Sequence, residues 1–293
     1  MKDSVFSTKP TLNIGGKITS LDSPRVMGIL NVTPDSFYGD SRLASEKEIL
    51  ASASEMISEG ATWLDVGGYS SRPGALHISK EEELERVIPA IKAILKEIPS
   101  AHISIDTFRS EVARCALDAG ASMVNDISGG ELDEKMAEVL ALYKVPYVLM
   151  HMKGTPQNMV HASHYDDIIY EIMDYFQKKL HKLLSIGVVD VILDLGFGFA
   201  KTIEQNFYLL DNLAVFKMLE RPILVGISRK SMISKTLGVE TADALNGTTA
   251  LHMVASQNGA DILRVHDVKE AMQAIKLHNR LKMNNGNIGT ELK

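Results

Sequence analysis

The chain has 293 residues, of which 45% are hydrophobic and 23% are charged, and its formal net charge is −6 at pH 7. This composition is typical of a soluble globular protein, and a negative net charge without a basic block argues against a nucleic-acid partner. Residues 1–24 contain no apolar leader and no other stretch has the length of a membrane span, so we expect a cytoplasmic protein without a membrane partner. The single cysteine, Cys115, excludes an internal disulfide and fits a reducing compartment.

The first predicted elements are a short hairpin and a buried strand. Residues 11–19 place a pair of glycines between two short extended runs, which predicts a hairpin that covers one end of the fold. Residues 25–31 are apolar on both faces and stop at Asn31, as a strand of a buried parallel sheet does. A helix follows over residues 45–59, where apolar residues recur at helical spacing.

The unit of strand and helix then recurs along the chain. Each later buried strand is followed by a segment with helical spacing of its apolar residues. The count reaches about eight units, and eight right-handed units close a parallel barrel. The expected strands are residues 62–66, 102–106, 122–126, 147–150, 191–194, 223–228 and 261–266, and the expected helices are residues 80–98, 110–119, 132–143, 165–184, 205–219, 230–237, 242–258 and 268–283.

The predicted fold is therefore α/β, a single (β/α)8 TIM barrel with a short N-terminal hairpin. A doubly wound open sheet is the alternative, but such sheets seldom reach eight units without a second domain, and no linker divides this chain. We place the N-terminal extension with its hairpin at residues 1–24, the barrel at residues 25–283 and a frayed polar tail at residues 284–293.

Polar residues occupy the carboxyl ends of the predicted strands. In a parallel barrel these ends meet at one mouth, where enzymes of this fold place their chemistry. Removing so many polar groups from water around an empty mouth would cost free energy without compensation, which favours a functional site over an ordinary barrel rim. The residues are Asn31, Asp65, Asp106, Asn125, His151, Asp194, Ser228 with Lys230, and Arg264 with His266.

The residue types indicate a ligand with two different ends. One set is cationic and suits a phosphate or diphosphate, because arginine offers a planar fork of donors and lysine a point charge. The other set is acidic or amide-bearing and suits a flat heterocycle that displays amino and ring N–H groups. We therefore expect a mouth with a cationic side and an acidic side. The cationic set is Arg72, Lys230, Arg264 and His266, and the other set is Asp106, Asn125 and Asp194.

Other sequence signatures of chemistry are incomplete. The run GFGFAKT at residues 196–202 lacks the second glycine of a P-loop and has Lys201 in the last place of a dinucleotide-binding pattern. His151, His161 and His164 lie near one another in the sequence, but no cysteine or suitably spaced carboxylate completes a zinc site. A nucleophile elbow with the G-x-S-x-G pattern is absent from the sequence.

Eight motifs follow one another over nearly the whole chain, namely MGILNVTPDSF, DVGGYSSRPG, SIDTF, VNDISGG, HMKGTPQNM, DLGFGFAK, GISRKSMI and RVHDV. In this order they resemble the dihydropteroate synthase family. The resemblance implies a homodimeric barrel enzyme of folate synthesis. Its reaction would condense (7,8-dihydropterin-6-yl)methyl diphosphate with 4-aminobenzoate to give 7,8-dihydropteroate and diphosphate, and sulfonamides would compete with 4-aminobenzoate.

The same resemblance implies a role for individual residues. The pterin would be held by Asp106, Asn125, Asp194 and Lys230. The diphosphate would be held by Asn31, Ser71, Arg72, Arg264 and His266, and the Mg²⁺ that travels with it would meet Asn31. The 4-aminobenzoate would lie against Phe37, Ser71, Pro73, Phe199 and Ser231. The implied catalytic set is Lys230, Asp106, Asp194, Arg264 and His266.

Elementary chemistry agrees with these roles. Loss of diphosphate from a carbon beside a conjugated ring is helped when Mg²⁺, Arg264 and His266 neutralise the leaving oxygens. Asp106 and Asp194 would face the positive charge that develops on the ring, whether the C–O bond breaks before or during attack. An arylamine is neutral at pH 7 and needs no strong base, so the reaction requires no dedicated serine or cysteine nucleophile.

The sequence departs from the family mainly in two loops that are expected to close over the site and exclude water, residues 34–41 and 67–77. The first loop has YGDSR where SDGG is usual. The second has Tyr69 where glutamate or glutamine is usual, and Ser71 in place of the commoner threonine keeps the hydroxyl. Leu195 replaces the usual proline of DPGFGF. These departures concern loop packing or drug sensitivity and leave the charged members of the site in place.

Three other functions fit parts of this pattern. A pterin-dependent methyltransferase would need a corrinoid partner and no clamp for diphosphate, which Lys230, Arg264 and His266 argue against. A Schiff-base aldolase would need a desolvated Lys230 of lowered pKa, whereas this residue follows Arg229 beside an acidic site. A pterin-binding paralogue without turnover would bind its ligand but lack charged members of the site, and all of them are present in the sequence.

Overall fold

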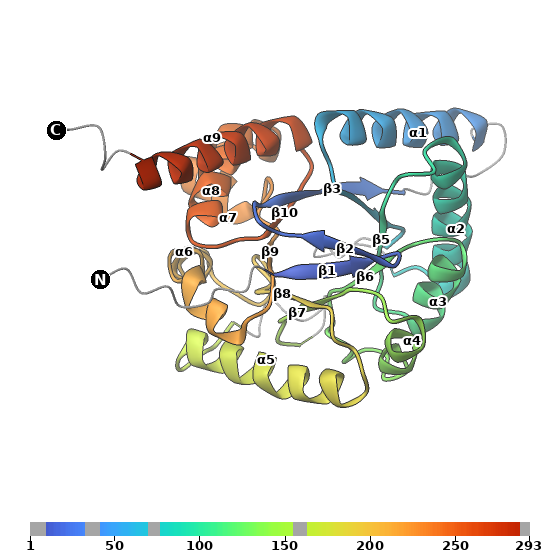
Figure 1. Cartoon of the computed structure of the whole chain (residues 1–293), viewed down its shortest axis with the longest axis horizontal. Coiled ribbons are helices and arrows are strands. Elements are labelled where there is room, and N and C mark those ends of the chain that lie inside the picture. The colour runs from blue at the N-terminus through green and yellow to red at the C-terminus, as the bar shows by residue number, and fades with distance from the viewer. Residues whose placement is uncertain (1–9, 33–41, 70–76, 155–162, 288–293) are drawn as a thin grey trace.

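The computed structural model describes residues 10–32, 42–69, 77–154 and 163–287. Within these residues, eight parallel strands close into a barrel, which confirms the predicted (β/α)8 fold. Neighbouring strands follow chain order, and the last barrel strand pairs with the first to close the ring (Figure 1). The barrel strands are β3 (Arg25–Asn31), β4 (Trp63–Gly67), β5 (Ile103–Asp106), β6 (Met123–Asp126), β7 (Tyr147–Met150), β8 (Val191–Asp194), β9 (Ile223–Val225) and β10 (Ile262–Val265).

Helices alternate with the strands and cover the outside of the barrel (Figure 1). Each presents an apolar stripe to the sheet because its buried residues recur at helical spacing. In the described residues the helices are α1 (Arg42–Glu59), α2 (Lys80–Glu97), α3 (Ser110–Asp118), α4 (Met136–Tyr143), α5 (Ile168–Ser185), α6 (Ile203–Asp211), α7 (Ser231–Leu237), α8 (Leu245–Gln257) and α9 (Val268–Asn287), with the 3-10 helices η4 (Leu213–Leu219) and η5 (Thr241–Asp243).

Polar side chains fix where some of the helices begin and end. The Ser79 hydroxyl accepts a hydrogen bond from the backbone N–H of Glu82 at 3.0 Å and so caps the start of α2. The single helix predicted over residues 205–219 is wrong, because α6 ends and the 3-10 helix η4 follows. At this junction the side-chain amide of Asn212 donates to the carbonyl oxygen of Tyr208 at 2.9 Å, in addition to the backbone bond. The last helix runs on past residue 283, to residue 287.

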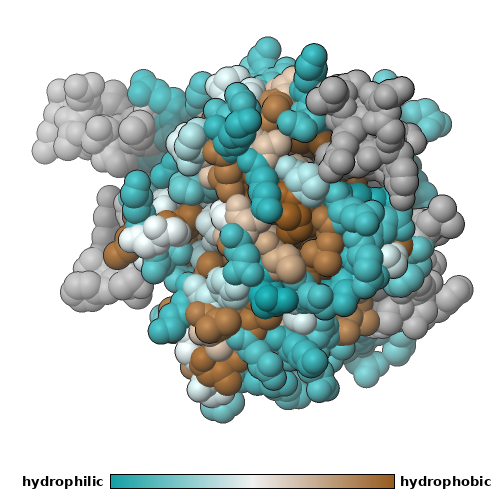
Figure 2. Space-filling view, turned by 90° about the vertical axis from the view of Figure 1, so that its right-hand side faces the viewer, coloured by the Kyte–Doolittle hydropathy of each residue, from teal (hydrophilic) through white to brown (hydrophobic). Residues whose placement is uncertain are grey.

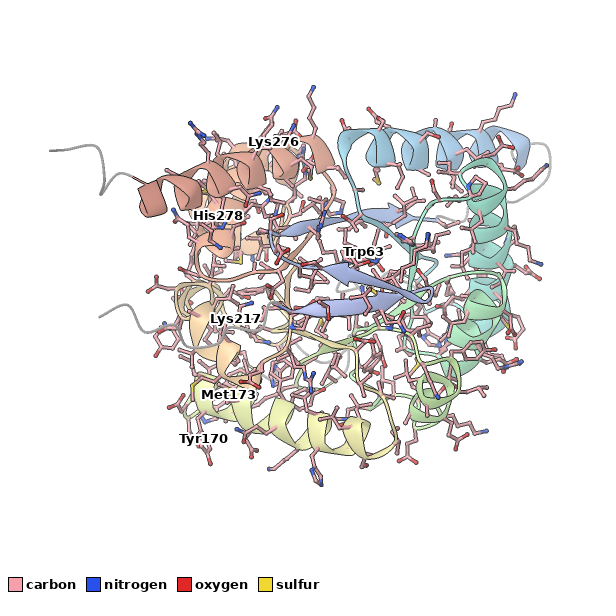
Figure 3. All side chains as sticks on the ribbon, viewed as in Figure 1. Trp63, Tyr170, Met173, Lys217, Lys276 and His278 are labelled. Atoms are coloured by element: carbon pink, nitrogen blue, oxygen red, sulfur yellow. The ribbon has the colours of Figure 1, made fainter. Side chains whose placement is uncertain are left out.

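The N-terminal hairpin closes the amino-terminal end of the barrel, as predicted. β1 (Thr11–Ile14) and β2 (Lys17–Ser20) pair antiparallel, and both glycines of the turn have positive φ. Figure 3 shows Trp63 inside the ring of strands, behind the hairpin. Side chains of the hairpin and from the beginnings of the barrel strands form one buried apolar layer, which consists of Leu12, Ile14, Leu21, Met27, Trp63, Met123, Val148, Ile192, Leu224 and Ile262.

The outer surface shows the polarity expected of helices that cover a barrel. Over α2 and α3 the surface is mostly hydrophilic, and apolar side chains are visible between the polar ones (Figure 2). Among the helices of the described ranges, none is long and apolar enough to cross a membrane.

Candidate active site

The alternation of side chains along the strands places two kinds of residue inside the barrel. Side chains two positions apart on a strand lie on the same face of the sheet. Four strands carry an apolar residue in the buried layer beside the hairpin, which is the lower layer. Two positions later, nearer the carboxyl-terminal end of the barrel, each carries a polar residue in an upper layer. These pairs are Trp63 and Asp65 in β4, Met123 and Asn125 in β6, Ile192 and Asp194 in β8, and Ile262 and Arg264 in β10.

Arg264 occupies the centre of this upper layer. Its Nε donates to Oδ2 of Asp65 and one of its terminal nitrogens donates to Oδ2 of Asp106, each at 2.6 Å. Asn125 donates to the same Asp65 oxygen at 2.9 Å. The expected division into a cationic side and an acidic side is therefore wrong for Arg264, because its guanidinium lies directly between two carboxylates.

Burial changes the protonation of the carboxylates in this layer. It raises the pKa of Asp106 to about 7, where Arg264 lowers the value and the negative charge of Asp65 raises it further. Burial also raises the pKa of Asp194, and the ammonium of Lys230 opposes that shift. A protonated carboxyl can donate a hydrogen bond and an ionised one only accepts, so this layer can match a heterocycle that carries both donors and acceptors.

The loop that follows β8 lies against Lys230. The Asp194 carboxylate accepts a hydrogen bond from the backbone N–H of Gly196 at 2.8 Å. The Lys230 ammonium donates to the carbonyl oxygen of Phe197 and lies 4.8 Å from the centre of the Phe199 ring. Burial lowers the pKa of Lys230 to about 8, although Asp194 opposes the shift. The sequence-based argument against a lowered pKa at this lysine is therefore wrong, because the nearby carboxylates offset its desolvation only in part.

The backbone segments after β9 and β10 are tied together beside the mouth. The Ser228 hydroxyl oxygen accepts a hydrogen bond from the backbone N–H of His266 at 3.2 Å and lies 3.1 Å from Nδ1 of its ring. Arg229, with a φ of +53°, makes two hydrogen bonds to the Asp267 carboxylate, at 2.9 and 2.8 Å. These contacts fix the backbone that carries Lys230 and His266.

The remaining predicted site residues lie at the rim or in segments that are not described. Asn31 is the exposed last residue of β3, and Ser231 is the exposed first residue of α7. Both belong to the carboxyl-terminal end of the barrel, as the sequence predicts. The other four, Phe37, Ser71, Arg72 and Pro73, lie outside the described residues.

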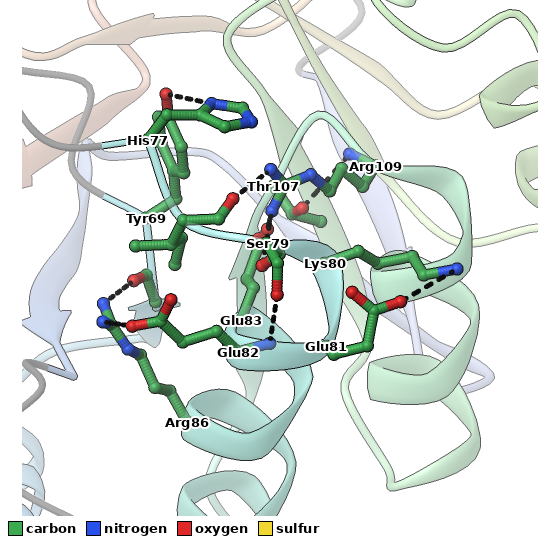
Figure 4. Close-up of polar contacts among 12 residues, drawn as sticks. Tyr69, His77, Ser79, Lys80, Glu81, Glu82, Glu83, Arg86, Thr107 and Arg109 are labelled. Atoms are coloured by element: carbon green, nitrogen blue, oxygen red, sulfur yellow. Dashed lines mark hydrogen bonds and ion pairs between the residues drawn. The ribbon is translucent and has the colours of Figure 1, made fainter.

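Two arginines hold the backbone on either side of the loop between β4 and α2 (Figure 4). Arg86 donates to the carbonyl oxygen of Gly68 at 2.9 Å, and Arg109 donates to the carbonyl oxygen of Ile78 at 2.6 Å. Arg109 also pairs with the fully buried carboxylate of Glu83, whose pKa is raised by that burial. The flanks of this loop are therefore fixed by charge-assisted hydrogen bonds.

Tyr69 and Leu195, the two residues that depart from the usual form of the motifs, both pack against other residues of the fold. The Tyr69 ring packs edge-on against Phe108 with 5.2 Å between ring centres, and its hydroxyl lies 3.4 Å from Nδ1 of His77. Leu195 is completely buried in the core that surrounds the barrel. Tyr69 therefore joins an aromatic cluster beside the end of β5, and Leu195 adds apolar packing under the glycine-rich loop.

Two residues contribute more to the site than the sequence indicates. Asp65 is one of the polar strand ends but has no assigned role; in the fold it accepts hydrogen bonds from both Arg264 and Asn125. In the sequence, Lys201 is noted only because it does not fit the last position of a glycine-rich dinucleotide-binding pattern. In the fold, its ammonium lies 3.1 Å from the Gly196 carbonyl oxygen. A signal for Asp65 existed, since it occupies the same kind of position as Asp106.

Comparisons with known proteins agree with this geometry. Residues 27–266 match the family described as pterin binding enzyme. The dihydropteroate synthase of Escherichia coli (strain K12) is 44% identical over 264 residues, which cover 88% of this chain and 93% of that protein. The crystal structure of the Yersinia pestis dihydropteroate synthase with a sulfonamide drug complex has a TM-score of 0.87 at 38% identity, and the match covers 94% of this chain and 100% of that chain.

The dihydropteroate synthase of Xanthomonas albilineans in complex with 7,8-dihydropteroate has a TM-score of 0.82 at 36% identity, and the match covers 93% of this chain and 99% of that chain. The extent of these matches, their sequence identity and the shared barrel all indicate the same family. The chain therefore belongs to the dihydropteroate synthase family of pterin-binding enzymes.

Proposed function

We propose that this site joins (7,8-dihydropterin-6-yl)methyl diphosphate to 4-aminobenzoate and releases diphosphate, as a step of folate synthesis. The observation that carries the proposal is the buried layer in which Arg264 is bonded to Asp65 and Asp106 while Asn125 shares the Asp65 oxygen. A barrel that served only as a scaffold would gain stability from apolar packing at these positions, because a buried ion network is costly. The layer is therefore kept for a polar ligand.

The pterin is proposed to lie against Asp106, Asn125, Asp194 and Lys230. Carboxylates of Asp106 and Asp194 would accept hydrogen bonds from amino and ring N–H groups, and the Asn125 amide offers both a donor and an acceptor. Lys230 would donate to an acceptor on the ring. Asp65 supports this arrangement because it holds the Asn125 amide in one orientation.

The diphosphate is proposed to lie toward Arg264, His266 and Asn31, with Ser71 and Arg72 contributing from the loop after β4. The described residues contain no group of three or more histidine, cysteine or carboxylate side chains that could hold a metal ion. This fits Mg²⁺ bound mainly by the diphosphate, since that ion keeps several waters and needs only one or two protein ligands such as the Asn31 amide oxygen. When bound, the ion would neutralise charge on the leaving oxygens.

The chemical step breaks the C–O bond to diphosphate and forms a C–N bond to the amine of 4-aminobenzoate, which then loses one proton to solvent. Arg264 and His266 would stabilise the negative charge on the departing diphosphate. Asp106 and Asp194 would stabilise the positive charge on the ring. The 4-aminobenzoate, and sulfonamides in competition with it, are proposed to lie against Phe37, Ser71, Pro73, Phe199 and Ser231.

The test is diphosphate release by the purified protein in the presence of both substrates and Mg²⁺. Asp194→Asn is the matched variant, because its amide oxygen can still accept from the Gly196 N–H while the charge is lost. We expect calorimetry to show pterin affinity reduced by about tenfold or more in this variant. Absence of diphosphate release by the unaltered protein would contradict the proposed reaction, and unchanged pterin affinity in the variant would contradict the proposed pterin site.

The lowered pKa of Lys230 favours one second candidate, a Schiff-base lysine that attacks a keto substrate. In the structure this ammonium is engaged by the Phe197 carbonyl oxygen. Borohydride reduction in the presence of a keto substrate, followed by mass spectrometry, separates the two functions. We expect no covalent adduct at Lys230.

A homodimer in the cytoplasm is the proposed assembly and compartment. An apolar groove of about 390 Å³ lies between α6 and α8 and is lined by Phe207, Tyr208, Leu210, Asp211, Leu251 and Val254. The same face of a second copy could cover this groove and remove its apolar surface from water. Sedimentation at twice the chain mass of 32.2 kDa would support the dimer, and sedimentation at the mass of one chain would contradict it.

A further inference from the structure

The ammonium group of Lys201 is enclosed by acceptors of one wall of the site. Its Nζ lies 3.1 Å from the carbonyl oxygens of Gly196 and Phe199. It also lies 3.4 Å from the carbonyl oxygen of His151 and 3.2 Å from Nδ1 of the same residue. An ammonium has three N–H donors, so these acceptors can take all of them. Lys201 therefore has no donor left for a ligand, and any effect on substrates must pass through the residues that it holds.

The enclosure removes this ammonium from water, and this loss of solvation changes its pKa. The pKa of Lys201 is lowered to about 7 by desolvation, against the attraction of Asp194. The other charged groups that affect it are Lys230 and Lys153, both of which lower the pKa further. Buried carbonyl oxygens without a hydrogen-bond donor would cost free energy, and the Lys201 ammonium supplies donors to these oxygens.

The loop that Lys201 holds has a backbone that needs support. Gly196, Gly198 and Ala200 have φ values of +69°, +79° and +50°. For a residue with a side chain such as Ala200 this left-handed conformation is strained. A β-carbon on Gly196 would lie only 2.0 Å from the carbonyl oxygen of His151, so the loop packs directly on the end of β7. Lys201 joins these same two segments through its hydrogen bonds.

The same loop forms the surface on which Lys230 rests. Phe197 accepts a hydrogen bond from Lys230 through its carbonyl oxygen, and the Phe199 ring lies 4.8 Å from the Lys230 ammonium. A β-carbon on Gly198 would lie 3.1 Å from Cδ of Lys230. A small shift of the loop would therefore displace both the Lys230 ammonium and the Phe199 ring.

We infer that Lys201 is a positioning residue, because it ties the loop after β8 to the end of β7 and so fixes Phe199 on the 4-aminobenzoate side of the site and, with it, the Lys230 ammonium on the pterin side. The inference rests on the roles proposed above for those two residues. Asp106 and Asn125 come from β5 and β6, and neither is among the hydrogen-bond acceptors of Lys201. Lys230 is only one of the four residues proposed for the pterin, so pterin binding should depend on Lys201 less than 4-aminobenzoate binding does.

The experiment compares Lys201→Met with Lys153→Met. Lys153 also lies after β7 but donates to the Glu171 carboxylate and the His164 carbonyl oxygen, so its loss removes a neighbouring lysine whose two hydrogen bonds go to residues outside the loop after β8. We expect Lys201→Met to raise KM for 4-aminobenzoate about tenfold or more, while the Kd of the pterin diphosphate changes by less than about threefold. Lys153→Met should leave both values within about threefold of those of the unaltered protein.

Lys201→Gln keeps two amide donors and should give a KM between those of the unaltered protein and Lys201→Met. If the methionine variant does not fold, the glutamine variant decides: a rise in KM supports the inference and an unchanged KM overturns it. An unchanged KM in a folded Lys201→Met, or equal losses for the two substrates, would also overturn it. Failure of the proposed reaction is distinguishable, because the unaltered protein would then release no diphosphate.

Discussion

At the scale of single residues, the site is built from charged groups that compensate one another out of water. Arg264 is bonded to both Asp65 and Asp106, and the Asp65 side chain has no exposure to solvent. Removing one partner of such a set leaves an unpaired buried charge, whereas the complete set adds little net stability. The arrangement therefore serves ligand binding at the expense of folding free energy, and its protonation should be visible in the pH dependence of stability.

The pH dependence assigned to Asp106 has a definite sign. Its folded pKa of about 7 lies above the ordinary value of 3.8, so the folded state retains a proton that the unfolded state has already released. The contribution of this group is fully present below the unfolded pKa and is lost as the pH rises through 7. Asp106→Asn removes the titration, and we expect the Tm difference between this variant and the unaltered protein to shift by several degrees in favour of the variant as the pH rises from about 4 to about 7.

Differential scanning calorimetry at a series of pH values measures this shift. Asp118→Asn is the control, because Asp118 is an exposed carboxylate on the outside of α3 with no role in the mouth. The Tm difference between the control and the unaltered protein should stay constant over the same range. A constant difference for Asp106→Asn as well would rule out the raised pKa as the cause.

At the scale of elements, residues with positive φ lie both in loops that follow strands and at the ends of helices. Gly196 and Gly238 both have positive φ, at +69° and +66°, but their surroundings differ. A β-carbon on Gly196 would lie 2.0 Å from the His151 carbonyl oxygen, whereas one on Gly238 would meet nothing within 4 Å. The two glycines therefore separate the cost of a left-handed backbone from the cost of close packing.

Alanine at each position tests this distinction. Gly238→Ala should cost about 1 kcal/mol of unfolding free energy, from backbone strain alone, and leave KM values unchanged. Gly196→Ala should cost more than about 3 kcal/mol or displace the loop after β8, and in either case raise KM for 4-aminobenzoate. Urea unfolding with steady-state kinetics gives both quantities. Equal effects of the two substitutions would show that contact with His151 is unimportant.

The elements also show what can be predicted from a sequence and what cannot. Short runs that are apolar on both faces predict the strands, helical spacing predicts most helices, and the rule that parallel strand ends meet predicts that Asp106, Asn125 and Asp194 share a mouth. The partners of Arg264 are not predictable in this way, since Asp65 lies 199 positions away and meets it only when the barrel closes. Positive φ at Ala200 is equally hidden, because alanine carries no signal for a left-handed backbone.

At the scale of the whole molecule, the two ends of the barrel have separate tasks. The amino-terminal end is sealed by apolar side chains of the hairpin and of the strand beginnings, and the carboxyl-terminal end carries the charged layer. Parallel strands make this possible because every strand begins at one end and finishes at the other. Substitutions at the sealed end should change stability and leave substrate affinity intact.

Ile14→Ala tests this separation of tasks. Ile14 is 1% exposed in the apolar layer under the barrel, whereas Ile18, across the turn in β2, is 79% exposed. Truncation of Ile14 should destabilise the protein by about 2–5 kcal/mol through lost burial and the cavity it leaves, and Ile18→Ala should stay within about 0.5 kcal/mol of the unaltered protein. Both variants should keep the KM values for pterin diphosphate and 4-aminobenzoate, when they are measured well below the Tm. A changed KM in Ile14→Ala with an intact fold would mean that the sealed end is coupled to the charged layer through Trp63 and Asp65, which occupy successive layers of the same strand.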